Sequence, residues 1–248
     1  MSDFNRGISR PTSVATDMSV DAGLRAFMLG VYNKVGLGLV LSAALAWLTG
    51  TYQPVQQLLF THDELGRTSY TILGIVVAFA PLGILLTQAF ARRTSPQIAG
   101  LVYWSIVACI GASFGLLFIF YSDISIFQTF LVTAAAFGGL SLVGYTTKRD
   151  LSGMGSFLIM GLWGLIFAML ANFLFHSAAL YFAINLIGVL IFAGLIAYDT
   201  QRLKLIYHQV GGDQAAMSVA TSYGALSLYL DFVNLFRFLL YFMGGSRR

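Results

Sequence analysis

Long apolar stretches separated by short polar segments dominate this chain. A helix crosses a hydrocarbon core of about 30 Å with roughly 20 mainly apolar residues, because each residue adds about 1.5 Å. Seven stretches reach this length, running approximately from Leu24 to Leu48, Tyr70 to Phe90, Ile98 to Phe120, Ile124 to Tyr145, Gly155 to Phe175, Leu180 to Tyr198 and Met217 to Met243. All are expected to be helices, since an isolated strand cannot satisfy its backbone hydrogen bonds in lipid.

The segments between these stretches are too short for a second folded domain. The pattern therefore predicts one seven-helix transmembrane domain over residues 24–248. The first 23 residues lack the basic and then apolar layout of a cleavable signal, and we expect residues 1–23 to form a flexible cytoplasmic tail. The fold class predicted from the pattern is an all-α membrane protein.

Composition supports lipid as the main solvent. Hydrophobic side chains make up 58% of the 248 residues and charged ones 10%, whereas a soluble domain carries about 25% charged residues. The net charge is +4, but the basic residues lie between long apolar runs rather than in one stripe, so nucleic acid is not an expected partner. The single cysteine, Cys109, excludes a disulfide within one chain.

The distribution of lysine and arginine predicts the orientation in the membrane. Basic residues occur before the first stretch and after the second, fourth and sixth, at Arg6, Arg10, Arg25, Arg92, Arg93, Lys148, Arg149, Arg202 and Lys204. The opposite connections hold Arg67 as their one basic residue, so these four segments and the amino terminus should be cytoplasmic. The seventh stretch either crosses, which we favour, or re-enters and returns, because Arg247 and Arg248 follow it.

Two acids fall within the predicted helices. Eight of the ten acidic residues lie in the tail or the connections, and only Asp199 and Asp231 lie in apolar stretches. A carboxylate at a helix centre costs roughly 2.5 to 3.5 kcal/mol in a membrane, so it calls for a partner, water or a proton. Topology places both acids in the inner half to middle of the membrane, and Asp231 shares one helix face with Tyr223, Ser227 and Asn234. We expect the two acids to form one site.

The chemistry of such a pair suggests a proton-dependent latch. Two carboxylates in contact cannot both ionise cheaply in a low dielectric, so they are expected to share one proton. When deprotonated, their oxygens are hard ligands suited to Ca²⁺. Protons and calcium ions would therefore compete at Asp199 and Asp231. Arg92, at the inner end of the second stretch, is a candidate countercharge, although composition alone favours a positive-inside anchor.

Three segments resemble the Bax inhibitor-1 family, also called the transmembrane Bax inhibitor motif family. They are the last helix, GALSLYLDFVNLFRFLLYFMG at Gly224 to Gly244, the loop FGGLSLVGYTTKRDLSG at Phe137 to Gly153, and AYDTQRL at Ala197 to Leu203. The resemblance extends over roughly residues 20 to 245. It implies a bacterial inner-membrane protein with seven helices, the last of them central in the bundle.

The resemblance also implies an activity. Family members are similar in acting as pH-sensitive calcium leak channels, and Asp199 and Asp231 match the aspartates of their latch. In bacterial relatives an arginine near the inner end of the second helix pairs with the sixth-helix aspartate. Arg92 or Arg93 matches it, with Arg92 preferred. The chain departs from those relatives in having no acid between Tyr70 and Arg92.

A pair of intramembrane acids is also compatible with a protease or a carrier. Intramembrane aspartyl proteases also use two aspartates, but they carry Gly-x-Gly-Asp before the second acid, whereas Asp231 follows Leu228, Tyr229 and Leu230. A proton-coupled carrier of small solutes is the main non-channel alternative. We expect no enzymatic activity and no cofactor. The expected partners are the lipid bilayer, protons and calcium ions.

Pairs of small residues predict close helix packing. Gly111 and Gly115 form one such pair in the third stretch, and Ala134 and Gly138 form another in the fourth.

Overall fold

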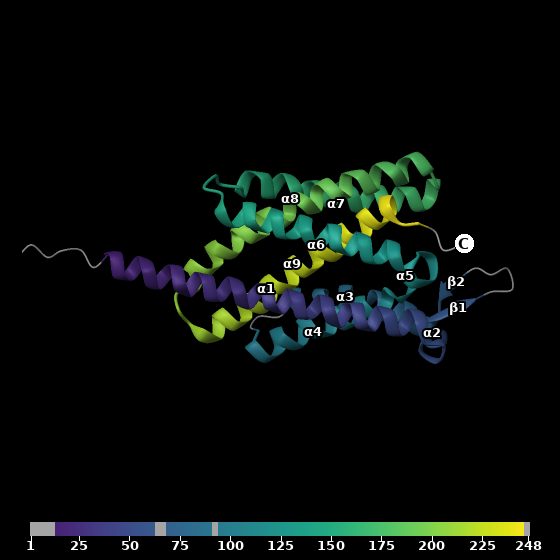
Figure 1. Ribbon diagram of the computed structural model, residues 1–248, viewed down its shortest axis with the longest axis horizontal. Coiled ribbons are helices and arrows are strands. Elements are labelled where there is room, and N and C mark those ends of the chain that lie inside the picture. Colours follow the sequence, from purple (N-terminus) through teal and green to yellow (C-terminus); the bar gives the residue numbers. More distant parts are fainter. Residues whose placement is uncertain (1–12, 63–67, 91–93, 246–248) are drawn as a thin grey trace, which may run out of the picture.

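The computed structural model describes residues 13–62, 68–90 and 94–245, which form a bundle of long helices (Figure 1). The long helices are α1 (Ser13–Thr51), α3 (Ile72–Ala89), α4 (Pro96–Ser113), α6 (Asp123–Thr146), α7 (Ser152–Phe175), α8 (Ala178–Val210) and α9 (Gln214–Met243). Six segments within this part of the chain are long and apolar enough to cross a membrane, and a shorter apolar helix covers Ile72–Gln88. Together they account for the seven predicted stretches.

Two short helices modify the predicted pattern. α2 (Gln53–Leu59) follows α1 directly, and α5 (Gly115–Phe120) continues the line of α4 after an interruption at Phe114. The third predicted stretch is therefore a broken helix. α1 begins at Ser13, earlier than the predicted edge of the first stretch at Leu24.

A small hairpin lies in the connection between α2 and α3, where the sequence indicated only a polar loop. Strands β1 (Phe60–His62) and β2 (Thr68–Tyr70) are antiparallel, with Phe60 opposite Tyr70. This sheet lies outside the candidate membrane spans, so its unpaired strand edges need not be satisfied in lipid.

Polar side chains at the helix starts set where the elements begin. The hydroxyl groups of Thr71, Ser95, Ser122 and Ser177 accept backbone N–H groups in the first turns of α3, α4, α6 and α8. The Asp213 carboxylate does the same for two N–H groups of α9. These caps satisfy amides that have no partner within the helix.

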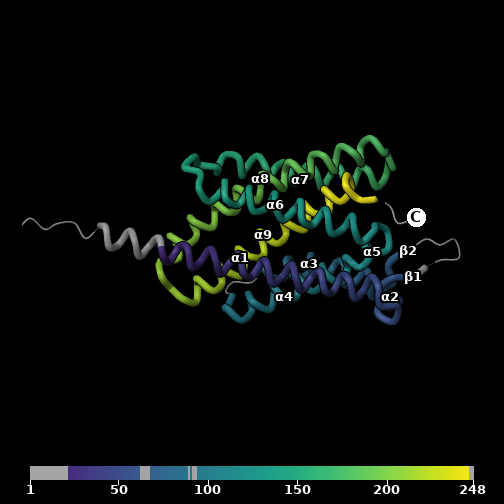
Figure 2. Tube along the Cα trace, in the orientation of Figure 1, coloured from purple at the N-terminus to yellow at the C-terminus, as the bar shows by residue number. Residues whose placement is uncertain are grey.

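α9 runs through the middle of the bundle (Figures 1 and 2). It packs against α1, α4, α6 and α8, while α3 lies on α4 and α7 lies on α8. More than half of its apolar window is buried, a larger share than in any other candidate span of the described residues. The prediction of a central last helix is confirmed, and the central position explains how α9 carries polar side chains within the membrane.

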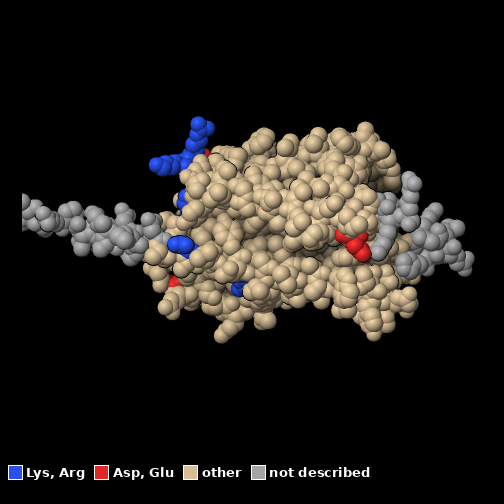
Figure 3. All heavy atoms as spheres, in the orientation of Figure 1, with Lys and Arg blue, Asp and Glu red and all other residues tan. Residues whose placement is uncertain are grey.

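Charged side chains lie mainly toward the two ends of the bundle. Figure 3 shows a broad uncharged band between basic atoms at the left and an acidic patch at the right. We call the left end the basic end, defined by Arg25, Lys148, Arg149, Arg202 and Lys204, and the right end the hairpin end, after β1 and β2. Many large apolar side chains between the ends are exposed, as expected of a surface covered by lipid.

Small residues set the closest helix approaches, as the sequence partly indicated. A Cβ atom on Gly111 would lie 2.6 Å from Ser42 Cα, so Gly111 permits α4 to contact α1. Gly115 likewise faces Thr49 and Gly50 of α1. A Cβ atom on Gly138 would meet nothing within 4 Å, so the predicted close packing at Gly138 is wrong.

Candidate functional site: a buried aspartate pair

Asp199 and Asp231 lie together inside the bundle. Asp199 comes from α8 and Asp231 from α9, and these two helices pack along each other. Their side chains are 8% and 6% exposed, and the two carboxyl groups are near enough for the charge of Asp199 to act on Asp231. Two buried negative charges repel each other in a low dielectric, so a proton on one of the two groups lowers the cost of burying the pair. The arrangement can therefore hold a shared proton.

Ser227 completes the pair from one turn before Asp231 on α9. Its hydroxyl donates a hydrogen bond to Asp199 Oδ2 across the α8–α9 contact. Asp231 Oδ2 is buried and has no hydrogen-bond partner within the described part of the chain. A buried acceptor without a partner is costly, and it leaves Asp231 able to take a proton, a water molecule or a cation.

The polar face of α9 extends on both sides of the pair. Tyr223 donates its hydroxyl hydrogen to Gln88 Oε1 of α3 at 3.0 Å. Asn234 donates its amide hydrogen to the backbone oxygen of Leu230 at 2.8 Å, which leaves its carbonyl oxygen available. The four residues that the sequence placed on one face therefore reach three different neighbours: α3, α8 and the backbone of α9 itself.

A cavity of about 350 Å³ lies beside Asp231, between α7, α8 and α9. Its polar lining is supplied by Ser227, Asp231 and Asn234, and the rest is apolar. It shares Met169, Asn234 and Phe238 with a larger cavity at the hairpin end of the bundle. Asp231 thus lies next to a chain of two adjoining cavities that leads toward the hairpin end.

The predicted countercharge cannot be compared with the structure, because Arg92 and Arg93 lie outside the described residues. A different cation, Arg202, interacts electrostatically with Asp199. Arg202 follows Asp199 by three positions, a spacing that puts two side chains on one helix face. That spacing was available in the sequence, but the basic residue was interpreted only as an orientation signal.

Sequence reasoning also missed the role of Lys34. Its ammonium group donates to Ser222 Oγ of α9 at 2.7 Å and lies 5.3 Å from the ring centre of Tyr103 in α4. Lys34 therefore joins α1, α4 and α9. The sequence pointed to Lys34 because it is the single lysine in a predicted membrane-spanning stretch. The sequence pattern did not identify the residues that Lys34 contacts.

As a cation site the pair offers two carboxylates. The described residues contain no group of three or more histidine, cysteine, aspartate or glutamate side chains that could hold a metal ion. Ca²⁺ takes about six to eight oxygen ligands and accepts water among them. Asp199 and Asp231 could supply the charged ligands, with the remaining oxygens coming from water in the adjoining cavity.

The fold and the site define a mainly helical integral membrane protein whose central last helix carries one acid of a buried pair. The chain matches the family model described as "Inhibitor of apoptosis-promoting Bax1" over residues 24–248. It therefore belongs to the Bax inhibitor-1 family, as the three resembling segments predicted.

Bacterial relatives match over almost their whole length. A protein from Caulobacter vibrioides is 58% identical over 249 residues, covering 100% of both chains. One from Rickettsia prowazekii is 40% identical, covering 95% of this chain and 96% of its own. The "Inner membrane protein YbhL" of Escherichia coli strain K12 is 41% identical, covering 91% of this chain and 94% of its own.

Proposed function

We propose that this protein is a pH-sensitive calcium leak channel of the bacterial inner membrane, gated by Asp199 and Asp231. The observation that carries the proposal is the proximity of these two buried carboxyl groups on neighbouring helices. The inner-membrane location is supported by the name of the YbhL relative and by the apolar surface of the bundle. The amino terminus is proposed to be cytoplasmic, as the basic end indicates.

The gate follows from the chemistry of the pair. With one proton shared, the carboxyl groups attract each other and hold α8 against α9. When the proton leaves, two negative charges in a low dielectric repel each other, which favours separation of the helices unless a cation bridges them. Ser227 stabilises the closed arrangement by donating to Asp199.

Calcium has a route to the pair in this mechanism. The cavity beside Asp231 adjoins the larger one at the hairpin end, and an ion entering from that end passes Arg237, whose positive charge must be balanced by an anion before Ca²⁺ reaches Asp231 Oδ2. The unpartnered oxygen of Asp231 supplies a ligand without first breaking a hydrogen bond. Opening toward the basic end then requires α8 and α9 to part beyond Asp199.

The test is calcium flux into liposomes that contain the purified protein, measured across a range of pH. We expect flux to rise with pH, because deprotonation introduces the repulsion that opens the gate. In Asp199→Asn and Asp231→Asn, the rise in flux between low and high pH should be about tenfold smaller than in the wild type. A tenfold change in the open population corresponds to about 1.4 kcal/mol. The control is Asp150→Asn, which removes an exposed carboxylate from the loop before α7.

An unchanged flux and pH profile in both Asn variants would refute the gate. The same preparation separates the channel from a protease, because a panel of single-span substrates should remain uncleaved. Proton-driven, saturable uptake of an organic solute would instead identify a carrier.

A further inference from the structure

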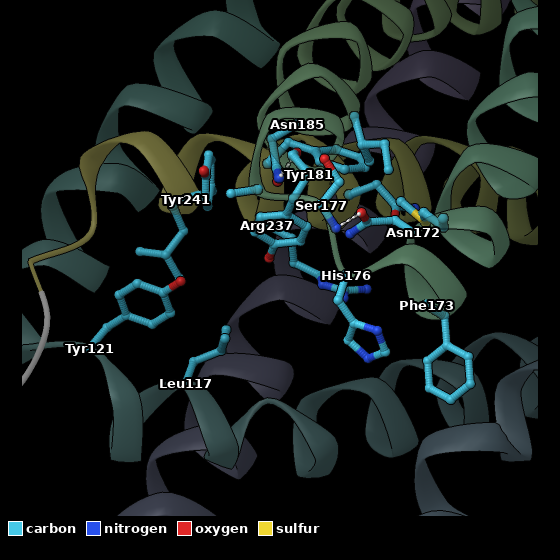
Figure 4. Close-up of a pocket in the computed structure, with 16 residues that line it drawn as sticks. Leu117, Tyr121, Asn172, Phe173, His176, Ser177, Tyr181, Asn185, Arg237 and Tyr241 are labelled. Atoms are coloured by element: carbon cyan, nitrogen blue, oxygen red, sulfur yellow. Dashed lines mark hydrogen bonds between the residues drawn. The ribbon is translucent and has the colours of Figure 1, made fainter.

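The larger cavity at the hairpin end has a volume of about 720 Å³ and is built by the ends of four helices. α7 and α8 meet there at His176 and Ser177, the end of α9 passes beside them, and Tyr121 follows α5. Figure 4 shows the labelled side chains of this cavity arranged around Arg237. Its volume is in the range of about 300–1,000 Å³ that small-molecule sites occupy.

The charge of this cavity is positive. Arg237 of α9 is a lining residue, and no aspartate or glutamate of the described chain lines the cavity. In Figure 4 the Arg237 side chain extends toward His176, with Tyr121 and Tyr241 on one side and Asn172 on the other. A guanidinium group in a cavity without a carboxylate is a ready partner for an anion from outside the chain.

The first turn of α8 adds to the positive character. Ser177 caps the helix by accepting the Leu180 N–H, and Ala178, its first residue, lines the cavity. The start of a long helix carries a partial positive charge and free N–H groups. Asn172 accepts the Ser177 N–H with its Oδ1 at 3.0 Å, which leaves its amide nitrogen as a further donor.

Phenol groups supply additional donors. Tyr121, Tyr181 and Tyr241 all line the cavity, and the rings of Tyr181 and Tyr241 meet edge to face with centres 4.9 Å apart. Burial raises the pKa of the Tyr121 phenol, and Tyr181 and Tyr241 raise it further, while Arg237 lowers it. Tyr121 therefore keeps its proton at neutral pH and can donate a hydrogen bond.

We propose that this cavity binds a phosphate group. A phosphate presents several acceptor oxygens and suits a site built from one guanidinium group, amide and phenol donors and a helix start. The cavity lies at one end of the membrane-spanning helices, where both a lipid headgroup and a dissolved organic phosphate could reach it. This inference does not depend on the proposed channel function.

The first experiment uses soluble probes. Full-length protein in a neutral detergent is titrated with inorganic phosphate and with glycerol 3-phosphate, and the thermal unfolding midpoint is followed. Saturable stabilisation is expected, since a ligand that binds only the folded state raises the unfolding temperature. Arg237→Gln should weaken the apparent affinity about tenfold or more, as expected for the loss of a charge-assisted hydrogen bond.

The second experiment uses lipid. Native mass spectrometry compares lipid retention after purification from nanodiscs of phosphatidylcholine with and without phosphatidylglycerol. Retention of phosphatidylglycerol that Arg237→Gln removes would identify a lipid headgroup as the source, whereas stabilisation by the soluble probes would identify a dissolved phosphate. Either result supports the site.

Two further variants distinguish a loss of binding from a loss of folding in Arg237→Gln. Asn172→Asp keeps the acceptor for the Ser177 N–H but places a negative charge beside Arg237, so it should abolish binding without altering the fold. Arg149→Gln removes an exposed arginine at the basic end and should leave binding unchanged. The proposal is overturned if neither probe nor lipid binds, or if binding is the same in wild type, Arg237→Gln and Asn172→Asp.

Discussion

Ser227 supplies the hydroxyl hydrogen bond to the buried acid Asp199. It lies one turn before Asp231 on α9 but donates to Asp199 on α8, so it contributes to the contact between the two helices. Without Ser227, Asp199 would lose its hydroxyl donor while remaining buried. The cost of a buried acceptor that loses its partner exceeds the net value of the hydrogen bond itself.

We therefore expect Ser227→Ala to destabilise the protein by about 1–3 kcal/mol, the usual cost of leaving a buried polar group unsatisfied. The measurement is the unfolding midpoint in detergent, repeated across pH because a protonated Asp199 needs the hydroxyl donor less. The matched control is Ser156→Ala in α7, whose exposed hydroxyl donates to the backbone oxygen of Ser152. Equal effects of the two substitutions would contradict the role assigned to Ser227.

At the scale of the elements, the distance between α6 and α8 is set by a glycine. Gly144 is buried against the backbone of Ala197, and a Cβ atom there would overlap the Ala197 carbonyl oxygen. Because Ala197 lies two residues before Asp199, this approach also positions the segment of α8 that carries the acid. The resembling loop segment of the sequence includes Gly144, but only the packed helices reveal what it contacts.

Gly144→Ala should destabilise the bundle by about 1–3 kcal/mol, because the backbones of α6 and α8 must separate to admit the methyl group. Gly139→Ala is the control, since a Cβ atom there meets nothing within 4 Å. Removing a glycine from an open helix position should be neutral or stabilise by about 0.5–1 kcal/mol. Thermal unfolding of both variants measures the difference. A Gly144→Ala variant as stable as Gly139→Ala would show that the two helices are not in close contact.

At the scale of the whole molecule, the two ends of the bundle differ in the charged side chains that they carry. Among the described residues, the basic end carries Arg25 of α1, Arg202 and Lys204 of α8, and Lys148 and Arg149 of the connection between α6 and α7. The hairpin end carries β1, β2 and the cavity around Arg237. Basic connections remain on the cytoplasmic side during insertion, so the basic end is expected to be cytoplasmic.

Cysteine labelling of intact spheroplasts tests this orientation. In a Cys109→Ala background, Tyr52→Cys near the hairpin end should react with a membrane-impermeant maleimide, because Tyr52 is 56% exposed. Arg149→Cys at the basic end should react only after the membrane is permeabilised. The opposite labelling pattern would invert the proposed topology.

Much of the fold could be predicted because helices in lipid depend on local features. Apolar length predicts a span, and the chain shows seven such stretches without reference to any contact. The hairpin of Phe60–His62 and Thr68–Tyr70 was missed because strands of three residues are too short to show an alternating apolar and polar pattern. The break at Phe114 was missed because the apolar pattern continues through it.

The sequence alone determined that two acids, Asp199 and Asp231, would be placed in the membrane, because composition and spacing decide which residues enter lipid. Only the tertiary structure decided which groups surround them: Ser227 as donor to Asp199, and the adjoining cavities that lead from Asp231 to Arg237. The physical reason is that periodicity defines the face of one helix, whereas the rotation and depth of its neighbours arise from packing across the whole bundle.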